Sequence, residues 1–315
     1  MNSTGGDSRR LLARLRALAS PNHVSEDGGA GRARTSSTTA PTSGALGVWN
    51  VKHGICLANI GTYSDPRVAV HVARAAEASG WDGIFLWDHL AFVWGPPAAD
   101  PWATLAAIAT STETLLLGTA VTPVARRRPQ VLANQVATLD VLSGGRVIFG
   151  AGLGGSPSEF GKFGEPTDAK LRAAMLDEGL DLLRHLWSGE EVTHHGEHYT
   201  VDGVTLKPAP AQDRLPIWIG GNRVPSQRRA ARWDGWLPDS GYPPGAGASP
   251  EDVSRGLTLI GESRSTDEFD VAVVGESHKA DRAAYEEAGA TWWLEGIHDQ
   301  RGSPEEMLEL VESAP

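Results

Sequence analysis

The residues best suited to acid–base chemistry are Asp88 and His89, which follow an apolar run at residues 83–87. An imidazole titrates near neutral pH, so His89 can accept a proton from a substrate hydroxyl or return one to an oxygen. Asp88 is a candidate to contact a ligand heterocycle or to set the loop. Adjacent strand residues point in opposite directions, so both side chains need not face one ligand. A purely structural Asp-His pair is the alternative.

Two glycine-rich segments have the composition of phosphate-binding loops, because backbone N–H groups can approach an anion closely where no Cβ intervenes. Each segment follows a predicted strand, and ordinary tight turns explain the same glycines equally well. Two such loops nevertheless favour one phosphorylated ligand. Their residues are Gly154, Gly155, Ser156, Gly220, Gly221 and Asn222.

Other site motifs are weak or missing from the sequence. Residues 150–155 match Gly-x-Gly-x-x-Gly, but they follow the fourth predicted strand, and we expect residues 156–167 to form an irregular loop rather than to open a helix. There is no Gly-x-Ser-x-Gly elbow and no P-loop, the usual signals of serine hydrolases and P-loop enzymes. His194, His195 and His198 cluster in a polar turn, which we interpret as solvated histidines rather than a metal site.

The elements that must position these residues alternate regularly from Val51 onward. Predicted strands at residues 54–59, 83–87, 115–121, 146–150, 216–220, 234–238, 269–275 and 291–295 are each followed by a helical pattern. Several helices open at a cap followed by proline, as in Asp65-Pro66 and Asp100-Pro101, and the last carries a Ser303-x-x-Glu306 capping box.

Eight strand–helix units within residues 51–315 match the length and connectivity of a (β/α)8 barrel of the α/β class. A doubly wound parallel sheet has the same alternation and stays open as the alternative. Either fold places function at the carboxyl ends of the strands. Residues 190–210 are predicted to form a hairpin-like insertion before the fifth strand, beside that face.

Composition narrows the class of protein further. The 315 residues include 28 Lys plus Arg against 39 Asp plus Glu, and the net charge of −11 argues against nucleic acid as a partner. A single cysteine, Cys56, excludes an intramolecular disulfide framework. No apolar stretch approaches the roughly 18 to 20 residues that span a bilayer. We expect a soluble, cytoplasmic protein.

Residues 1–50 differ from the rest of the chain. They contain a run at residues 34–44 with almost nothing apolar to bury, so they cannot offset the entropy of ordering. We expect a disordered N-terminal extension before a domain that spans residues 51–315.

The order of motifs after residue 51 resembles the bacterial luciferase-like superfamily. The similarity covers about residues 51–315 and supports the barrel over the open sheet. The motifs are Asp88-His89-Leu90, residues 117–123 with Arg128-Pro129, residues 139–146, Gly150-Ala151-Gly152, Glu159-Phe160, Phe163-Gly164, Leu186-Trp187, residues 216–221 and Asp234-Gly235-Trp236.

The resemblance implies an oxidoreductase or monooxygenase that binds FMN or the deazaflavin coenzyme F420 in the barrel mouth. It implies a bulge at Ala120-Val121, with a non-prolyl cis peptide, behind the ring, and Thr122 next to it. The phosphate would lie against the two glycine loops, and His89 would face the reactive edge of the ring. Sugar-phosphate dehydrogenases of this superfamily carry a catalytic Glu where this chain has Gly155, which argues against that activity.

The functional hypothesis is therefore an enzyme that acts on a small organic substrate, with F420 slightly favoured over FMN. With reduced FMN the reaction would use O2, whereas with F420 it would be hydride transfer. A flavin-binding or storage protein without turnover is the alternative. Phe92, Trp94, residues 190–210 and residues 242–247 are expected to select the substrate. A homodimer is an open prediction.

Overall fold

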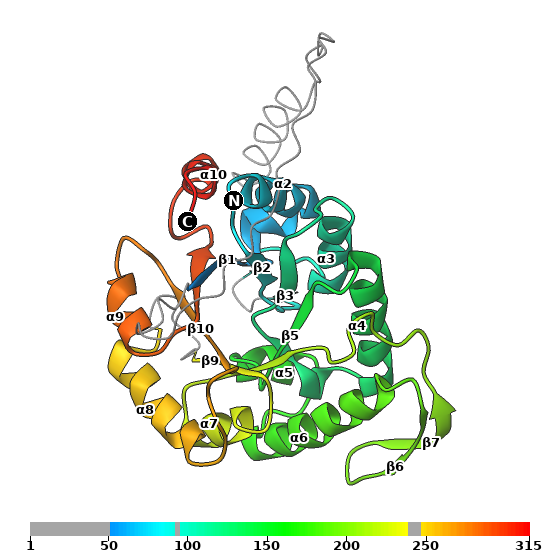
Figure 1. The fold of residues 1–315 in the computed structure, drawn as a ribbon. Helices are drawn as coiled ribbons and strands as arrows, with labels where there is room; N and C mark the ends of the chain where they lie inside the picture. Colours follow the sequence, from blue (N-terminus) through cyan, green and yellow to red (C-terminus); the bar gives the residue numbers. More distant parts are fainter. Residues whose placement is uncertain (1–50, 92–94, 239–246) are drawn as a thin grey trace, which may run out of the picture. The chain divides into compact units, whose positions relative to one another are not determined.

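The strands close into a parallel barrel (Figure 1). The order is β3-β2-β1-β11-β10-β9-β8-β5-β4, and the additional β3–β5 pairing joins the ends of the sheet. Because β3 and β4 both pair with β5, they share one of eight positions around the ring. The strands are β1 (Lys52–Leu57), β2 (Gly83–Leu86), β3 (Leu116–Thr119), β4 (Thr122–Pro123), β5 (Val147–Gly152), β8 (Ile217–Gly220), β9 (Gly235–Leu237), β10 (Asp270–Gly275) and β11 (Trp292–Ile297).

This computed structural model describes residues 51–91, 95–238 and 247–315. The predicted extension at residues 1–50 lies outside the described residues, and so do Phe92, Trp94 and residues 242–246 of the predicted substrate loops. Ring closure confirms the (β/α)8 barrel and excludes the doubly wound sheet, since an open sheet has two unpaired edges.

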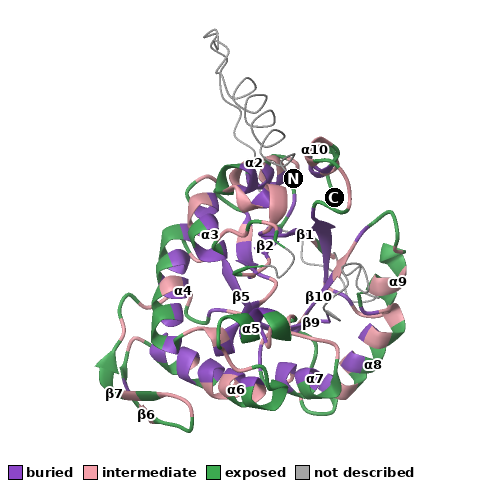
Figure 2. Cartoon of the chain, turned by 180° about the vertical axis from the view of Figure 1, so that it is seen from behind, coloured by how far each residue is buried: buried purple, intermediate pink, exposed green. Residues whose placement is uncertain are grey.

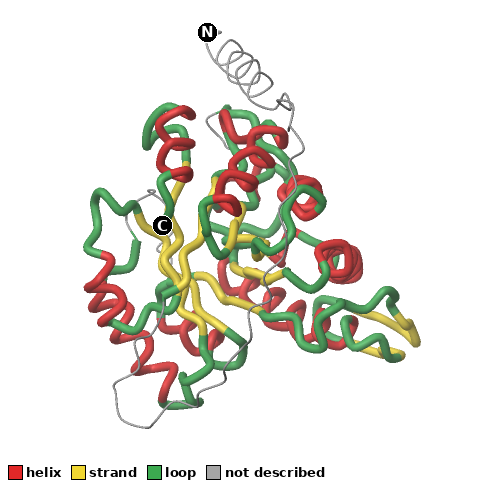
Figure 3. The backbone as a smooth tube through the Cα atoms, turned by 45° about the horizontal axis from the view of Figure 1, so that its top comes forward, coloured by secondary structure: helices red, strands yellow, loops and turns green. Residues whose placement is uncertain are grey.

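Helices surround the strands, as the tube in Figure 3 shows. Most begin with proline in the first turn, where its missing N–H is no loss, and Asp65, Asp100 and Ser303 cap their helices as predicted. The helices are α2 (Pro66–Ala78), α3 (Pro101–Ala109), α4 (Pro129–Ser143), α5 (Pro157–Lys162), α6 (Ala169–Leu186), α7 (Val224–Ala230), α8 (Pro250–Gly261), α9 (Arg282–Glu287) and α10 (Pro304–Glu312), with short 3-10 turns η1 (Gly61–Ser64) and η2 (Val124–Arg126).

Large aromatic side chains fill the barrel. Phe85 stacks on Trp218 with ring centroids 5.0 Å apart, and Trp292 packs edge-on against both rings. A Cβ at Gly118 would lie 2.8 Å from Phe85, so the glycine leaves room for this ring. In Figure 2 the strands are coloured as buried, and the helices around them are coloured as partly exposed. The interior of the barrel is thus a packed core, and the candidate site is expected at the carboxyl ends of the strands.

Two sequence predictions need correction. Residues 115–121 do not form one strand, because β3 ends at Thr119 and β4 begins at Thr122, with a cis Ala120–Val121 peptide between them. Residues 156–167 are not all irregular, because α5 occupies 157–162. Pro157 stands in the first turn of this helix, where proline is compatible with helix.

The predicted insertion before the fifth strand is an antiparallel hairpin of β6 (Glu191–His195) and β7 (Thr200–Thr205). Its described polar contacts are to Glu178 in the middle of α6, which accepts hydrogen bonds from the backbone N–H groups of His198 and Tyr199. The hairpin therefore lies on the outer side of α6 (Figures 1 and 3), away from the strand ends beside which we had placed it.

Candidate active site

Strand alternation decides which side chains enter the mouth of the barrel, the space at the carboxyl ends of its strands. Phe85 belongs to the interior core, so Trp87 and His89, two and four residues on, face the same interior. Their rings meet edge-on with centroids 6.0 Å apart. Asp88 lies between them and points the other way, toward the helices. The structure thus separates the two residues that the sequence placed together.

Asp88 is fully engaged outside the mouth. Its side chain is completely buried, and Nη2 of Arg127 donates to both carboxylate oxygens at 2.6 and 2.7 Å. The hydroxyl of Thr122 donates to Oδ2 at 2.8 Å. These bonds link the end of β2 to β4 and to the turn that follows β4. This arrangement corresponds to the second role considered for Asp88 in the sequence analysis, which is to set the loop.

His89 is held by a buried carboxylate. Its Nδ1 lies 3.1 Å from Oε2 of Glu159 on α5, and the side chain of Glu159 is only 3% exposed. The other oxygen of Glu159 accepts hydrogen bonds from the N–H groups of Leu90 and Ala91 at 2.8 and 3.1 Å. An ionised carboxylate only accepts hydrogen bonds, so we assign the ring proton to Nδ1 and the basic lone pair to Nε2.

The charge of Glu159 follows from its surroundings. Burial opposes ionisation, but the hydrogen bonds from His89 and Ala91 and the charges of His89 and Arg126 outweigh it and lower the pKa of Glu159 to about 2. Nη1 of Arg126 lies 3.2 Å from this carboxylate. Glu159 is therefore an anion at neutral pH and fixes the orientation of His89.

Arg126 and Arg172 surround Phe160, the residue after Glu159. Their guanidinium carbons lie 4.1 and 4.3 Å from the centre of its ring. Arg126 Nη2 and Arg172 Nε and Nη1 are buried and have no hydrogen-bond partner within the described part of the chain. Burial and the charge of Arg126 lower the pKa of Arg172, although Asp168 opposes this. Nε of Arg126 also donates to Glu165 at 3.0 Å, so the positive charge beneath the helix that carries Glu159 is partly neutralised.

The cis peptide predicted at Ala120–Val121 is present and brings the Val121 side chain against neighbouring strands. A Cβ at Gly152 would lie 2.5 Å from Val121, and one at Gly220 would lie 3.0 Å from it. Val121 and Ala120 are half-buried, and both pack against the interior core. Gly152 and Gly220 therefore have a steric role, which is to leave space for this valine.

The two glycine loops do lie side by side. Ala151 of β5 is in register with Ile219 of β8, so residues 153–156 and 221–223 leave adjacent strands at the same level. Gly155 is exposed, and a Cβ there would meet no atom within 4 Å. Gly154 is less free, since its φ is +82° and a Cβ would clash with Phe160.

The second loop is partly committed to the fold. The N–H of Gly221 donates to the carbonyl of Leu237 at 3.0 Å, and the indole of Trp236 donates to the Gly221 carbonyl. The Oδ1 atom of Asn222 is buried without a hydrogen-bond partner among the residues the structure describes. Asn222 is thus the member of this loop with an unused polar atom.

Sequence reasoning missed four polar residues of this end of the barrel. Glu159 was noted only as part of a motif, and Arg126, Glu276 and His298 were not noted. Glu276 directly follows β10 and His298 directly follows β11. Counting in steps of two from the interior residues of β10 and β11 would have identified Glu276 and His298 as residues that face the mouth.

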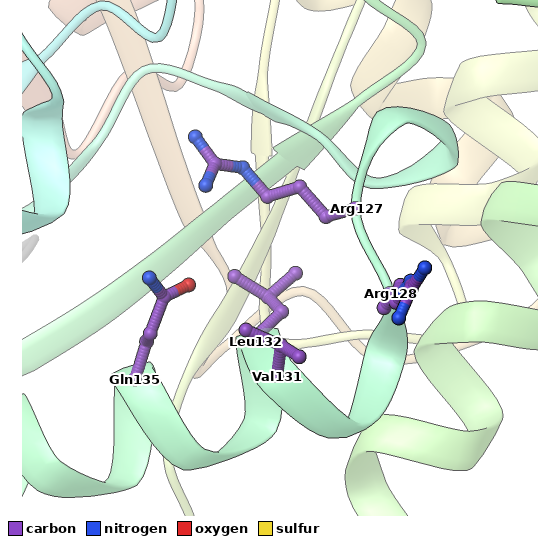
Figure 4. Close-up of a pocket in the computed structure, with 5 residues that line it drawn as sticks. All are labelled: Arg127, Arg128, Val131, Leu132 and Gln135. Atoms are coloured by element: carbon purple, nitrogen blue, oxygen red, sulfur yellow. The ribbon is translucent and has the colours of Figure 1, made fainter.

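A pocket outside the mouth lies on α4 and has a volume of about 220 Å³. Figure 4 shows Arg127 directed over it, with Leu132 and Gln135 along the helix. Its lining residues are Arg127, Arg128, Val131, Leu132 and Gln135. None of them is a predicted site residue, so we place the candidate active site at the mouth.

The described residues contain neither a cluster of metal ligands nor a helix that could span a membrane. No three His, Cys, Asp or Glu residues among them converge as metal ligands. His194 instead pairs with Glu178 through Nε2 at 3.0 Å. No helix in residues 51–91, 95–238 or 247–315 has the length and apolarity to cross a membrane. The predicted cytoplasmic location and homodimer stay predictions.

Comparison with known proteins identifies the family. Residues 51–310 match the luciferase-like monooxygenase family, and the chain belongs to it. It is 31% identical to the F420-dependent hydroxymycolic acid dehydrogenase of Mycobacterium tuberculosis, over 91% of this chain and 78% of that one. It is 38% identical to the F420-dependent glucose-6-phosphate dehydrogenase of Nakamurella multipartita, over 57% of this chain.

That second match spans 54% of the Nakamurella protein, about half of its length. Among solved structures, the coenzyme F420-dependent tetrahydromethanopterin reductase of Methanopyrus kandleri superposes with a TM-score of 0.68 at 20% identity, over 83% of this chain and 97% of that one. This likeness supports the barrel fold.

Proposed function

We propose that the protein is an F420-dependent oxidoreductase that exchanges a hydride with a small organic substrate. The names of the two relatives support the choice of coenzyme. The observation that carries the proposal is the His89–Glu159 pair, a histidine inside the mouth oriented by a buried anion. Such a pair is suited to moving a proton while a hydride is transferred elsewhere.

We expect the mouth to hold a flavin-like group with a phosphate. Ala120, Val121 and Thr122 would back the ring, because Ala120 and Val121 pack half-buried against the interior core just after β3. The open backbone at Gly154, Gly155 and Ser156 would hold the phosphate, where a side chain at residue 155 would otherwise project. Gly220, Gly221 and Asn222 would form the second wall. F420 supplies the carbon that accepts or releases the hydride.

Within this site, Nε2 of His89 would accept the proton of a substrate hydroxyl, or donate one to a carbonyl oxygen in the reverse direction. Glu159 would stabilise the imidazolium that forms, and hold the ring through Nδ1. Asp88 would act from outside, by keeping β2 and β4 together through Thr122 and Arg127. We do not propose glucose 6-phosphate as substrate, because Gly155 has no side chain to act as a catalytic carboxylate.

A cofactor titration of the full chain tests the proposal. Tryptophan fluorescence is followed while F420 or FMN is added, and bound F420 is then offered alcohols. Saturable F420 binding with oxygen-insensitive turnover supports the proposal. Binding of FMN alone, with O2 consumption by the reduced protein, would move the assignment to monooxygenation. Binding without turnover would indicate a storage protein, and no binding would refute the cofactor assignment.

A pair of variants locates the phosphate. Ser156→Asp adds a negative charge to the proposed phosphate loop, and Ser254→Asp adds the same charge on the exposed side of α8. We expect Ser156→Asp to raise the Kd for F420 about tenfold or more, the effect of about 1.4 kcal/mol of repulsion, and Ser254→Asp to leave it unchanged. Equal effects of the two variants would place the phosphate elsewhere.

A further inference from the structure

His298 and Glu276 face the same interior as Trp87 and His89. Trp292 and Leu294 of β11 and Ala272 of β10 belong to the interior core. Two-residue alternation then directs His298 and Glu276, which lie an even number of positions farther along, into the mouth. The mouth therefore receives a histidine from each side of Trp87.

Strand register explains how these groups meet. Cys56 of β1 is in register with both Phe85 of β2 and Gly296 of β11, so Ala58 lies between Trp87 and His298. Ala58 is small, and the Trp87 indole stacks on the His298 imidazole across it, with centroids 6.2 Å apart and planes at 29°. On the other side, Gly275 pairs with Glu295, so Glu276 is level with Gly296.

The two nitrogens of His298 have different surroundings. Nε2 lies 3.7 Å from Oε1 of Glu276. Nδ1 is buried and has no hydrogen-bond partner in the part of the chain that the structure describes. His298 is only 9% exposed, so bulk water does not readily serve this atom. Buried polar atoms are nearly always bonded, and a missing partner at a barrel mouth indicates a place that a ligand completes.

Charges around His298 determine its protonation. Burial lowers the pKa of His298, and Arg301 and Lys279 lower it further, while Glu276 raises it. Burial opposes ionisation of Glu276, but Lys279, His298 and Arg301 lower its pKa. Nζ of Lys279 lies 2.8 Å from Glu276, and His278 lies 3.5 Å from it. The neutral imidazole then directs Nε2–H toward an anionic Glu276, and Nδ1 is a hydrogen-bond acceptor.

We propose that His298 is a substrate-binding residue of the mouth, whose Nδ1 accepts a hydrogen bond from a second hydroxyl group of the substrate, with Glu276 as its positioning residue. The first hydroxyl is the one whose proton His89 would accept. The proposal deepens the function proposed above and rests on it, because it names organic molecules with at least two hydroxyl groups as the substrate class. The Trp87 face beside His298 would contact the apolar part of such a molecule.

Nitrogen NMR of the full chain labelled with 15N-histidine tests the proposal without turnover, in the presence and absence of F420. The His298→Gln variant assigns the signal. We expect Nδ1 of His298 to be unprotonated at neutral pH and to shift on addition of propane-1,2-diol, which has one hydroxyl for each histidine. Acetone, which cannot donate a hydrogen bond, is expected to leave the signal in place. A protonated Nδ1, or no response to propane-1,2-diol, overturns the proposal.

Kinetics separate the two ring nitrogens. The amide of His298→Asn lies where Nδ1 was, whereas that of His298→Gln lies where Nε2 was. With a diol that the enzyme oxidises, we expect His298→Gln to raise KM about tenfold with little change in kcat, the effect of one lost hydrogen bond, and His298→Asn to retain most affinity. Equal effects of both variants would refute the role of Nδ1.

The matched control is His278→Gln. His278 also lies near Glu276, but its side chain is 53% exposed, and we expect no change in KM. The Kd for F420 is measured for each variant. Failure of the wild type to bind F420 refutes the proposed function, whereas unchanged F420 binding with an unchanged KM in His298→Gln refutes only the role of His298.

Discussion

Arginines at the two ends of the barrel have different hydrogen-bond partners. Arg146, just before β5 at the amino end, donates five hydrogen bonds, to carbonyls of Ser143, Leu115, Ala109 and Thr112 and to the Thr112 hydroxyl. Arg126 and Arg172, at the carboxyl end, leave buried N–H groups without partners among the described residues.

The difference separates a stability role from a site role. The carbonyl groups that accept hydrogen bonds from Arg146 belong to the end of α3, the end of α4 and the loop before β3, at the amino end of the barrel. Arg126 instead shares Glu159 with His89, and both arginines support Phe160 on the helix that carries that glutamate. Polar groups left partly unsatisfied cost stability, and they are retained where function needs them.

The largest expected effect is on catalysis. Replacing His89→Ala removes the proton acceptor of the mouth, so we expect kcat/KM with F420 and an alcohol to fall between about 10²- and 10⁴-fold. Because the buried Glu159 carboxylate loses its hydrogen bond to His89, the free energy of unfolding should also fall, by about 1 to 3 kcal/mol. Steady-state kinetics and urea unfolding check both statements. A variant with unchanged kcat/KM and unchanged F420 affinity would show that His89 is not the acid/base.

A change at the amino end should act on stability alone. Arg146→Met leaves several carbonyl oxygens without their donor, and we expect it to lower the free energy of unfolding by about 3 kcal/mol. The Kd for F420, measured under folding conditions, should stay within about twofold of wild type. A large change in affinity together with unchanged stability would contradict the division between the two ends.

Glu159→Gln is expected to lower stability by about 2 to 3 kcal/mol, with a defined pH dependence. Because the folded pKa of Glu159 is about 2 and its ordinary value is 4.5, its contribution is fully present above about pH 4.5 and is lost as the pH falls toward 2. The stability difference between wild type and variant should therefore narrow over this range. Urea unfolding at several pH values measures it, and a difference independent of pH would refute the assigned pKa.

The smallest effect is expected for Arg172→Met. The methionine stem preserves packing on Phe160 and removes the repulsion by Arg126, while the lost N–H groups had no partner in the described chain. The free energy of unfolding should change by less than about 1 kcal/mol, in contrast to Arg146→Met. If Arg172→Met destabilised the protein as much as Arg146→Met does, the proposed difference between the arginines at the two ends of the barrel would be refuted.

Much of the fold was predictable because it depends on local patterns. The apolar run before Asp88, the proline at the start of α4 and the capping box at Ser303 each act through near neighbours in sequence. The error at α5 is also local, since Pro157 is compatible with both a loop and the first turn of a helix. What favoured the helix is Phe160, which packs against Gly154 and two arginines.

The candidate site was predictable only in part. His89, the cis peptide at Ala120–Val121 and the adjacent glycine loops were all predicted from strand ends and from the family resemblance. The partners of these residues were not. Glu159 lies 70 positions from His89, and Asp88 bonds Arg127, 39 positions away. Pairing of charges across such separations depends on packing that no short pattern records.

The sequence by itself determined the succession of strands and helices and, to within two residues, where the strands end, because periodicity, caps and prolines act over a few residues. Only the tertiary structure decided which of those strand ends share a site. Pairing of β3 with β5 closes the ring, and pairing of β1 with both β2 and β11 brings Trp87 beside His298. Residues from opposite ends of the domain meet there because a closed sheet has no edges.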